Sequence, residues 1–208
     1  MTVIALLGAE CTGKSSLTAA LGQQLADLRA ATISEHLRDW CEAHGRTPRQ
    51  AEQRDIARTQ TARIAAAARR HPLVIADTTA LMTALYSRHY FADEALFADA
   101  LPQQRRVALT FLCCPEGIPW QADCWMRDGD STRQSTHQEL LALLTEQELP
   151  FVLLQGSLAA RTAQAQALIR ELPRSGLKLD AKLDAKDERD DAIIRWRCAC
   201  CPPNPPLC

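Results

Sequence analysis

Five short apolar segments recur along the chain, and each is bounded by glycine, proline or charged residues. They are TVIALL (2–7), AATIS (30–34), LVIAD (73–77), RVALTFLCC (106–114) and PFVLLQG (150–156). Apolar runs of this length are typical of strands that are covered on both faces of a parallel sheet. The pattern therefore predicts five parallel strands.

Segments with helical spacing separate these strands. After the first strand, leucines recur every three or four residues, as they do on one face of a helix; they are Leu17, Leu21, Leu25 and Leu28. Further helices are predicted over 35–44, 48–70, 79–101 (as one or two pieces), 134–148 and 157–172. Alternating strands and helices are typical of an α/β fold, here a five-stranded, parallel, doubly wound sheet with helices on both faces.

Two segments lack both patterns. Residues 115–133 contain Gly, Pro, Asp and Arg without periodicity, which predicts a mobile loop. After Pro173 a four-residue Lys/Asp repeat is followed by a Pro- and Cys-rich end, so we expect an irregular tail over 173–208. The expected organisation is one domain over 1–172 and a charged, then Pro/Cys-rich tail.

Composition and charge exclude several classes of protein. Of the 208 residues, 47% are hydrophobic and 24% are charged, which excludes a wholly disordered chain. The formal net charge of −1 gives no bulk attraction to nucleic acid or to acidic membranes. No apolar run approaches the length that spans a bilayer. We therefore expect neither nucleic acid nor a membrane as a partner.

The N-terminal residues and the cysteines indicate the cytoplasm. The apolar start MTVIALLGAE has no basic lead-in, so we interpret it as a buried strand and not as a secretion signal. The nine cysteines are an odd number in a chain without an export signal, which argues against a disulfide framework.

A phosphate-binding motif follows the first strand. Residues 8–15, GAECTGKS, match G-x-x-x-x-G-K-[ST], in which glycines let backbone N–H groups surround phosphate at a helix N-terminus. Lys14 would reach the β- and γ-phosphates, and it is the only lysine in residues 1–177. Ser15 would ligate Mg²⁺. The expected ATP site comprises Gly8, Ala9, Glu10, Cys11, Thr12, Gly13, Lys14, Ser15 and Ser16.

Three residues after the second and third strands are candidates for the acceptor side. Ligands in open α/β sheets bind beyond the carboxyl ends of the strands. Asp77 would reach Mg²⁺ there, or it caps the helix that follows. Glu35 would accept the proton of a substrate hydroxyl, or it only favours a helix N-terminus. Arg38, one helical turn later, would face the same cleft.

The segment 115–133 and the tail carry the remaining candidates. Arginines of a loop that closes over phosphates exclude water in small kinases, whereas the plain alternative is a solvated surface loop. The loop candidates are Trp120, Asp123, Arg127, Asp128 and Arg133. Four tail thiols either bind zinc, or belong to a flexible tail or to a partner-binding peptide, and their spacing is cramped for zinc. They are Cys198, Cys200, Cys201 and Cys208.

The order of these motifs resembles a known family. GAECTGKSSL, SEHLRDW, VIADTTALMTALYSRHYF and IPWQADCWMRDG occur in the order found in ribosylnicotinamide kinases, the kinase domain of bifunctional bacterial NAD-biosynthesis proteins and its stand-alone ATPase relatives. The likeness covers about residues 1–172. Cys11-Thr12 replaces the family's usual pair of serines, and Cys124 stands where glycine is common.

The resemblance implies a P-loop fold and a Mg-ATP-dependent kinase. Its substrate would be nicotinamide riboside, phosphorylated on the 5′-hydroxyl to the mononucleotide. It implies an ATP loop at 8–16 and substrate-side roles for Glu35 and Arg38. It further implies metal or ribose contact by Asp77, and a closing loop with Trp120, Asp123, Arg127 and Arg133. In this loop we expect Trp120 and Asp123 to bind the substrate, Arg127 to act in catalysis and Arg133 to bind ATP.

Two other functions stay open. One is a kinase for another nucleoside. The other is a regulatory P-loop ATPase whose tail binds a partner; the loop over 115–133 favours a kinase, because a kinase supplies its own closing segment. The sequence also leaves a homodimer open.

Overall fold

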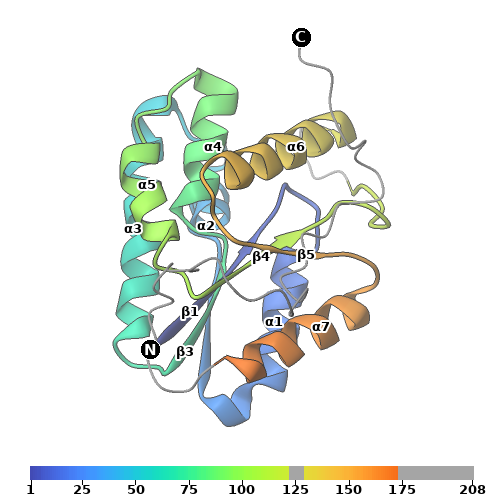
Figure 1. Cartoon of the computed structure of the whole chain (residues 1–208). Coiled ribbons are helices and arrows are strands. Elements are labelled where there is room, and N and C mark those ends of the chain that lie inside the picture. Colours follow the sequence, from blue (N-terminus) through green and yellow to red (C-terminus); the bar gives the residue numbers. More distant parts are fainter. Residues whose placement is uncertain (122–128, 173–208) are drawn as a thin grey trace, which may run out of the picture. The chain divides into compact units, whose positions relative to one another are not determined.

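The computed structural model describes residues 1–121 and 129–172 (Figure 1). Within them the chain forms one parallel sheet with the spatial order β2-β3-β1-β4-β5. Its strands are β1 (Thr2–Leu7), β2 (Ala30–Ile33), β3 (Leu73–Asp77), β4 (Leu109–Cys113) and β5 (Val152–Leu154). The predicted doubly wound parallel sheet is confirmed. The first and third strands have the predicted bounds, the second ends one residue earlier, and the last two are shorter than expected.

Helices connect the strands, and their bounds differ from the expected ones at a few ends. They are α1 (Lys14–Gln24), the short 3-10 helix η1 (Ala26–Leu28), α2 (His36–His44), α3 (Gln50–Ala68), α4 (Ala80–Phe91), α5 (Phe97–Gln104), α6 (Asp130–Glu146) and α7 (Leu158–Glu171). The segment predicted as one or two helices over 79–101 is two, because Ala92 adopts a left-handed conformation that ends α4.

The predicted loop over 115–133 is too long at its C-terminal end. Helix α6 begins at Asp130, directly after Gly129 at φ 123°, so Arg133 lies in its first turn and not in a loop. The polar first turn of α6 concealed this start, since its apolar residues begin only at Leu140. Residues 122–128 and the predicted tail over 173–208 lie outside the described residues.

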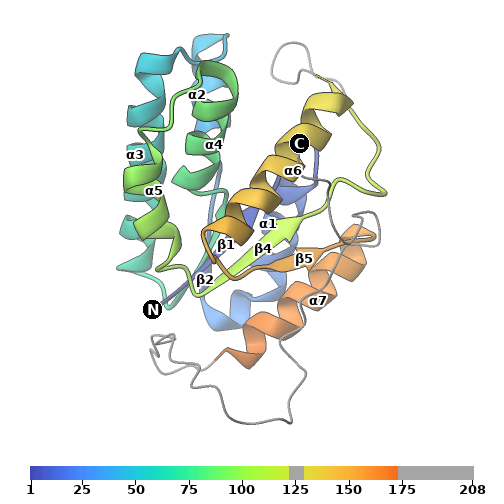
Figure 2. The ribbon, with the colours of Figure 1, turned by 45° about the horizontal axis from the view of Figure 1, so that its top comes forward.

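Two apolar clusters, one on each face, hold the helices against the sheet. In β1, Ala5 and Leu7 face a cluster formed with α4, α5 and α6, whereas Ile4 and Leu6 face α1 and α7. The views of the ribbon show these two sets of helices on opposite sides of the strands (Figures 1 and 2). Alternate residues of a strand point to opposite faces, so this central strand is buried on both.

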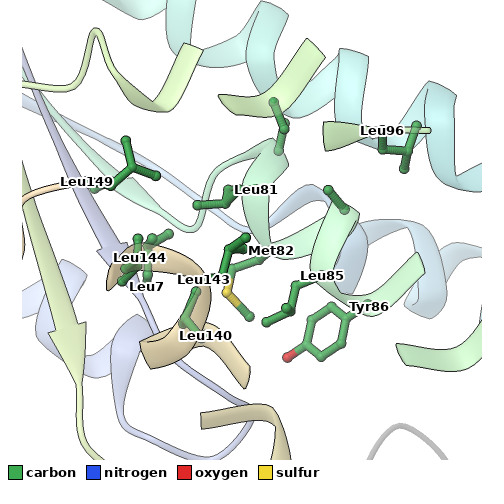
Figure 3. Packing of buried hydrophobic residues seen from close by; sticks show 14 of the residues in the cluster. Leu7, Leu81, Met82, Leu85, Tyr86, Leu96, Leu140, Leu143, Leu144 and Leu149 are labelled. Carbon is green, nitrogen blue, oxygen red and sulfur yellow. The ribbon is translucent and has the colours of Figure 1, made fainter. Parts of the chain in front are cut away.

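The larger cluster lies between α4 and α6. Figure 3 shows Met82 and Leu85 of α4 directed at Leu140 and Leu143 of α6, with Tyr86 at the edge of the group. These apolar contacts fix α4, which follows directly from the end of β3, and α6, whose first turn carries Arg133. No helix within the described ranges is long and apolar enough to cross a membrane.

The register brings the strand ends to one edge. Leu6 of β1 pairs with Asp77 of β3, and Ile33 of β2 pairs with Ala76. Because all strands are parallel, the segments after Leu7, Ile33 and Asp77 leave the sheet at the same end. The edge therefore gathers the motif at 8–16 and the candidates that follow β2 and β3.

Candidate active site

Two glycines shape the loop between β1 and α1. Gly8 has a φ of 152°, and a Cβ there would lie 2.9 Å from the carbonyl oxygen of Cys113 and 2.9 Å from Thr12 Oγ1. Gly13, at φ 78°, is the N-cap of α1 and provides no side-chain cap. The first N–H groups of a helix have no intrahelical partner, so those of α1 are left for an anion. The loop has the backbone that phosphate binding needs.

Lys14 closes this loop from inside. It is the first residue of α1, its side chain is buried, and Nζ donates to the carbonyl oxygen of Ala9 at 2.8 Å. Thr12 Oγ1 donates to the same oxygen at 2.8 Å. Ser15 is exposed at the start of α1, where its hydroxyl is accessible to a ligand. A compact ammonium thus lies in the loop at the place where phosphates would bind.

Two buried arginines donate hydrogen bonds to backbone carbonyls of the loop. Arg161 of α7 is 2% exposed; its Nη1 donates to Thr12 O at 3.1 Å and its Nη2 to Cys114 O at 2.9 Å. Arg133 of α6 donates from Nη1 to Cys11 O at 3.2 Å and to Ile118 O at 2.9 Å. Because its N–H groups turn inward, such a loop presents carbonyls outward. Each arginine therefore bridges one carbonyl of the loop and one carbonyl of the segment that follows β4.

The Cys11 side chain lies against the same segment. Gln121 N–H donates to Cys11 Sγ at 3.4 Å, and Sγ lies 3.6 Å from the carbonyl oxygen of Pro119. Trp120, between them, has the Arg133 guanidinium 5.5 Å from its ring centroid. Cys11 also adopts a φ of 52°. The residue that departs from the family's serine therefore takes part in the contact between the loop and residues 118–121.

On the other side of the edge, Glu35 precedes α2. It is the N-cap residue, its side chain is 11% exposed, and Arg38 Nη2 lies 3.7 Å from its Oε2. Burial raises the pKa of the Glu35 carboxyl above its ordinary value; Lys14 opposes the rise and Asp77 adds to it. These charges act on Glu35 because the residues share the strand-end edge. A carboxylate with a raised pKa is a better proton acceptor than an ordinary one.

Asp77 ends β3 with a buried side chain. Its Oδ1 has no hydrogen-bond partner among the described residues. An orphaned buried carboxylate oxygen is costly, so it indicates an external partner such as a cation. Mg²⁺ is usually held by one or two protein groups together with substrate phosphates, and Asp77 with Ser15 fits that set. No group of three or more His, Cys, Asp or Glu side chains within residues 1–121 and 129–172 is placed to hold a metal.

Glu10 and Tyr86 form a further pair beside Glu35. The Tyr86 hydroxyl lies 3.5 Å from Glu10 Oε2, and the ring of Tyr86 is 9% exposed. Burial, followed by the charges of Glu10 and Glu35, raises the pKa of Tyr86 well above its ordinary value. Tyr86 therefore stays a neutral phenol, next to carboxylates from the phosphate loop and from the acceptor side.

The structure brings together one part of the predicted site. Lys14, Glu35, Arg38 and Asp77 meet at the strand-end edge. Arg133 donates to the loop carbonyl of Cys11, and Trp120 contacts Arg133. Outside the described residues lie Asp123, Arg127 and Asp128 and the tail thiols Cys198, Cys200, Cys201 and Cys208. The expected catalytic role of Arg127 and the expected zinc site therefore stay predictions, as do the roles of the residues that meet.

Two residues that position this edge were not predicted. Arg161 attaches the loop to the strand ends, and Gln60 of α3 binds the backbone of both Asp77 and His36. Each sits in the apolar stripe of its helix, Arg161 with Ala165 and Ile169, and Gln60 with Ile56. A long polar side chain at an apolar position is the sequence signal that would have indicated them.

A family model described as an AAA domain matches residues 3–161. Solved structures with the same fold include NadR in complex with NR, at 21% identity and a TM-score of 0.64, covering 82% of this chain and 51% of that one. NadR in complex with NAD and AMP-PNP is 20% identical with a TM-score of 0.62, and the match covers 86% of this chain and 51% of that one. A deoxyadenosine kinase from M. mycoides with dcmp and dcdp bound is 10% identical with a TM-score of 0.50, and the match covers 81% of this chain and 99% of that one. A search of curated proteins finds no match.

These likenesses confirm the P-loop fold and the resemblance stated from the sequence, at the level of the fold. The chain spans about half the length of the NadR proteins and nearly all of the deoxyadenosine kinase. The fold is that of P-loop proteins that bind nucleosides and nucleotides.

Proposed function

The chain belongs to the AAA domain family, and from that premise we propose that it is an ATP-dependent kinase of nicotinamide riboside that forms nicotinamide mononucleotide. The observation that carries this proposal is the placing of Glu35 at the same strand-end edge as Lys14 and Asp77. A P-loop alone is equally compatible with an enzyme that only hydrolyses a nucleotide. A largely buried carboxylate at the same edge as the loop supports transfer to a hydroxyl.

The residues divide the work of phosphoryl transfer. Backbone N–H groups of 8–15 and the Lys14 ammonium would bind the phosphates of ATP and stabilise charge on the transferred group. Glu35 would orient the 5′-hydroxyl and accept its proton as the new P–O bond forms and the bond between the γ-phosphorus and the bridging oxygen breaks, with ADP as the leaving group. Arg38, 3.7 Å from Glu35, would keep that carboxylate in place.

Asp77 and Ser15 are the residues that would hold Mg²⁺. The ion supplies charge neutralisation for the β- and γ-phosphates when it is bound. The free Oδ1 of Asp77 and the exposed hydroxyl of Ser15 support this assignment.

The charge of the edge favours nicotinamide riboside over other nucleosides. Its pyridinium ring carries a permanent positive charge, which adenine, cytosine and the other common bases lack. With Asp77 assigned to the metal and Glu35 to the hydroxyl, Glu10 and the ring of Tyr86 would face the base; the Glu10 carboxylate lies 3.5 Å from the Tyr86 hydroxyl. Both groups attract a cation. The likeness to NadR bound to NR supports the same choice.

The test is product analysis over a panel of nucleosides with Mg-ATP. The panel contains nicotinamide riboside, its neutral 1,4-dihydro form, deoxyadenosine, deoxycytidine and inosine. We expect nicotinamide riboside to give a 5′-phosphate by mass spectrometry, with kcat/KM at least roughly tenfold above that of the dihydro form, which has the same shape without the charge.

Two other outcomes would identify a different function. If deoxyadenosine is phosphorylated and nicotinamide riboside is not, the protein is a kinase with a different substrate, in line with its likeness to the deoxyadenosine kinase. ATP hydrolysis that is indifferent to every nucleoside would instead indicate a regulatory ATPase whose tail binds a partner.

A further inference from the structure

Gln60 is a polar residue in the middle of the apolar face of α3. Its side chain is 2% exposed, and all of its hydrogen bonds go to the backbone of other elements. His36 N–H donates to Oε1 at 2.8 Å. Nε2 donates to the carbonyl oxygen of Thr78 at 3.2 Å and to that of Asp77 at 3.5 Å. One amide group therefore connects the start of α2 with the end of β3.

Both ends of this connection adjoin residues of the proposed site. His36 is the first residue of α2 and directly follows Glu35, while Asp77 is the last residue of β3. The pairing of β2 with β3 ends at Ile33 and Ala76, so the strand hydrogen bonds do not extend to Glu35. Gln60 continues the connection where the sheet stops.

The backbone at Thr78 needs such a partner. Thr78 is a β-branched residue at φ 68°, in the left-handed region that L side chains rarely adopt. Strained backbone persists only where surrounding contacts hold it. Here the contacts are Thr78 N–H to Leu6 O at 3.1 Å and Gln60 to the Thr78 carbonyl.

We propose that Gln60 is a positioning residue for phosphoryl transfer, because it fixes the backbone of Glu35 at a set distance from that of Asp77 without touching substrate itself. The inference rests on the proposed kinase function. A transferred group and its acceptor must be aligned closely, and a shift of about 1 Å costs up to roughly 10²-fold in rate. Loss of the connection should then lower kcat while phosphate binding at the loop persists.

The experiment compares Gln60→Met with Gln53→Met. Gln53 lies two turns earlier on the same face of α3, is 4% exposed, and its Oε1 has no hydrogen-bond partner among the described residues. Both changes remove a buried amide of similar size. We expect Gln60→Met to lower kcat roughly tenfold or more with KM for ATP within about threefold of the wild type, and Gln53→Met to leave both within about twofold.

A second readout is independent of catalysis. Amide hydrogen exchange of His36 should be faster in Gln60→Met by about tenfold or more and unchanged in Gln53→Met, because only the first variant frees this N–H. If Gln60→Met does not fold, Gln60→Glu retains an oxygen for His36 and loses the amide donor. We expect this variant to show slow exchange at His36 and a lowered kcat.

The results separate this inference from the proposed function. An active wild type with equal kcat losses in Gln60→Met and Gln53→Met, or with unchanged exchange at His36, would overturn the role of Gln60 alone. A wild-type kcat in Gln60→Glu would overturn it as well. A wild type that phosphorylates no nucleoside would overturn the kinase, whatever the exchange of His36 shows.

Discussion

The phosphate side and the acceptor side of the edge are built in different ways. The phosphate side is one contiguous loop, 8–16, whose shape follows from its own glycines and from Lys14. The acceptor side assembles Glu35 and Asp77 from the ends of two strands, and Gln60 from a helix joins their backbones. A contiguous site depends mainly on its own residues. A distributed one depends on everything that sets the distance between its parts.

Loss of the Lys14 side chain should abolish the function of the phosphate side. In Lys14→Ala we expect phosphoryl transfer to fall at least roughly 10³-fold with every nucleoside, because the ammonium stabilises the transferring charge. The change should leave the circular dichroism spectrum as in the wild type. ADP release coupled to a dye measures the rate. Turnover near the wild-type value would show that the loop does not bind the reacting phosphates.

Glu35→Gln should break the acceptor side alone. The amide keeps the shape of the carboxyl but accepts no proton, so kcat should fall roughly 10²- to 10⁴-fold while KM for ATP changes little. In the wild type, kcat should decline as the pH falls through the raised pKa of Glu35, above the ordinary value of 4.5. A pH profile without that limb would contradict the role of Glu35 as base.

The same substitution should stabilise the protein. Because the pKa of Glu35 is raised on folding, its charged form is disfavoured in the folded state, and stability is lost as the pH rises from 4.5 through the raised value. Glu35→Gln should therefore unfold at a higher temperature than the wild type at pH 7 and at the same temperature at pH 4. A thermal scan at both values checks this. A variant that is less stable at pH 7 would contradict the burial cost.

Asp77→Asn should weaken the binding of Mg²⁺ without removing a group of the phosphate loop or the proposed base. A neutral amide is a poor ligand for a hard cation, so the Mg²⁺ concentration for half-maximal activity should rise roughly tenfold to hundredfold. Asp99→Asn, on the exposed surface of α5, is the matched control and should leave the Mg²⁺ requirement unchanged. Equal Mg²⁺ titrations in both variants would remove Asp77 from the metal site.

The smallest activity effect is expected at Arg161, which supports the loop from outside. Arg161→Met leaves the carbonyls of Thr12, Cys114 and Gly156 without their donor, so it should cost roughly 2 to 4 kcal/mol of unfolding free energy. It should raise KM for ATP more than it lowers kcat. Urea unfolding and initial rates measure both.

Arg170→Met on the same helix is the control. Arg170 forms an exposed ion pair with Asp27, 2.9 Å apart, and such pairs contribute little. Its loss should leave the free energy of unfolding close to that of the wild type. Equal destabilisation by Arg161→Met and Arg170→Met would show that the loop does not depend on its outer support.

The comparison of the two sides also explains what could be predicted from the sequence. The loop and Lys14 were predictable because eight consecutive residues define their conformation. Glu35 and Asp77 could be placed at one edge because parallel strands end together. The raised pKa of Glu35 was not accessible, since it depends on burial and on distances that arise only when β2 and β3 pair.

The partners of the supporting residues were hidden in the sequence for another reason, although a polar residue in an apolar stripe does indicate that a buried partner exists. Gln60 and Arg161 act on backbone carbonyls, and a carbonyl leaves no trace of residue type in the sequence. The same applies to Arg133, which was expected in a loop and lies buried on α6. Its helix begins with a polar turn, and its partners Cys11 and Ile118 are distant in the chain.

The strand order also determines when this loop can acquire its shape during synthesis. β1 is made first, yet its partners β3 and β4 begin at residues 73 and 109. At roughly 5 to 20 residues per second, the uncharged hexamer TVIALL waits several seconds on the ribosome for its second neighbour. Such a segment is prone to pair with other chains while it waits. The strand that carries the phosphate loop is therefore exposed to wrong pairing until β3 and β4 have been made.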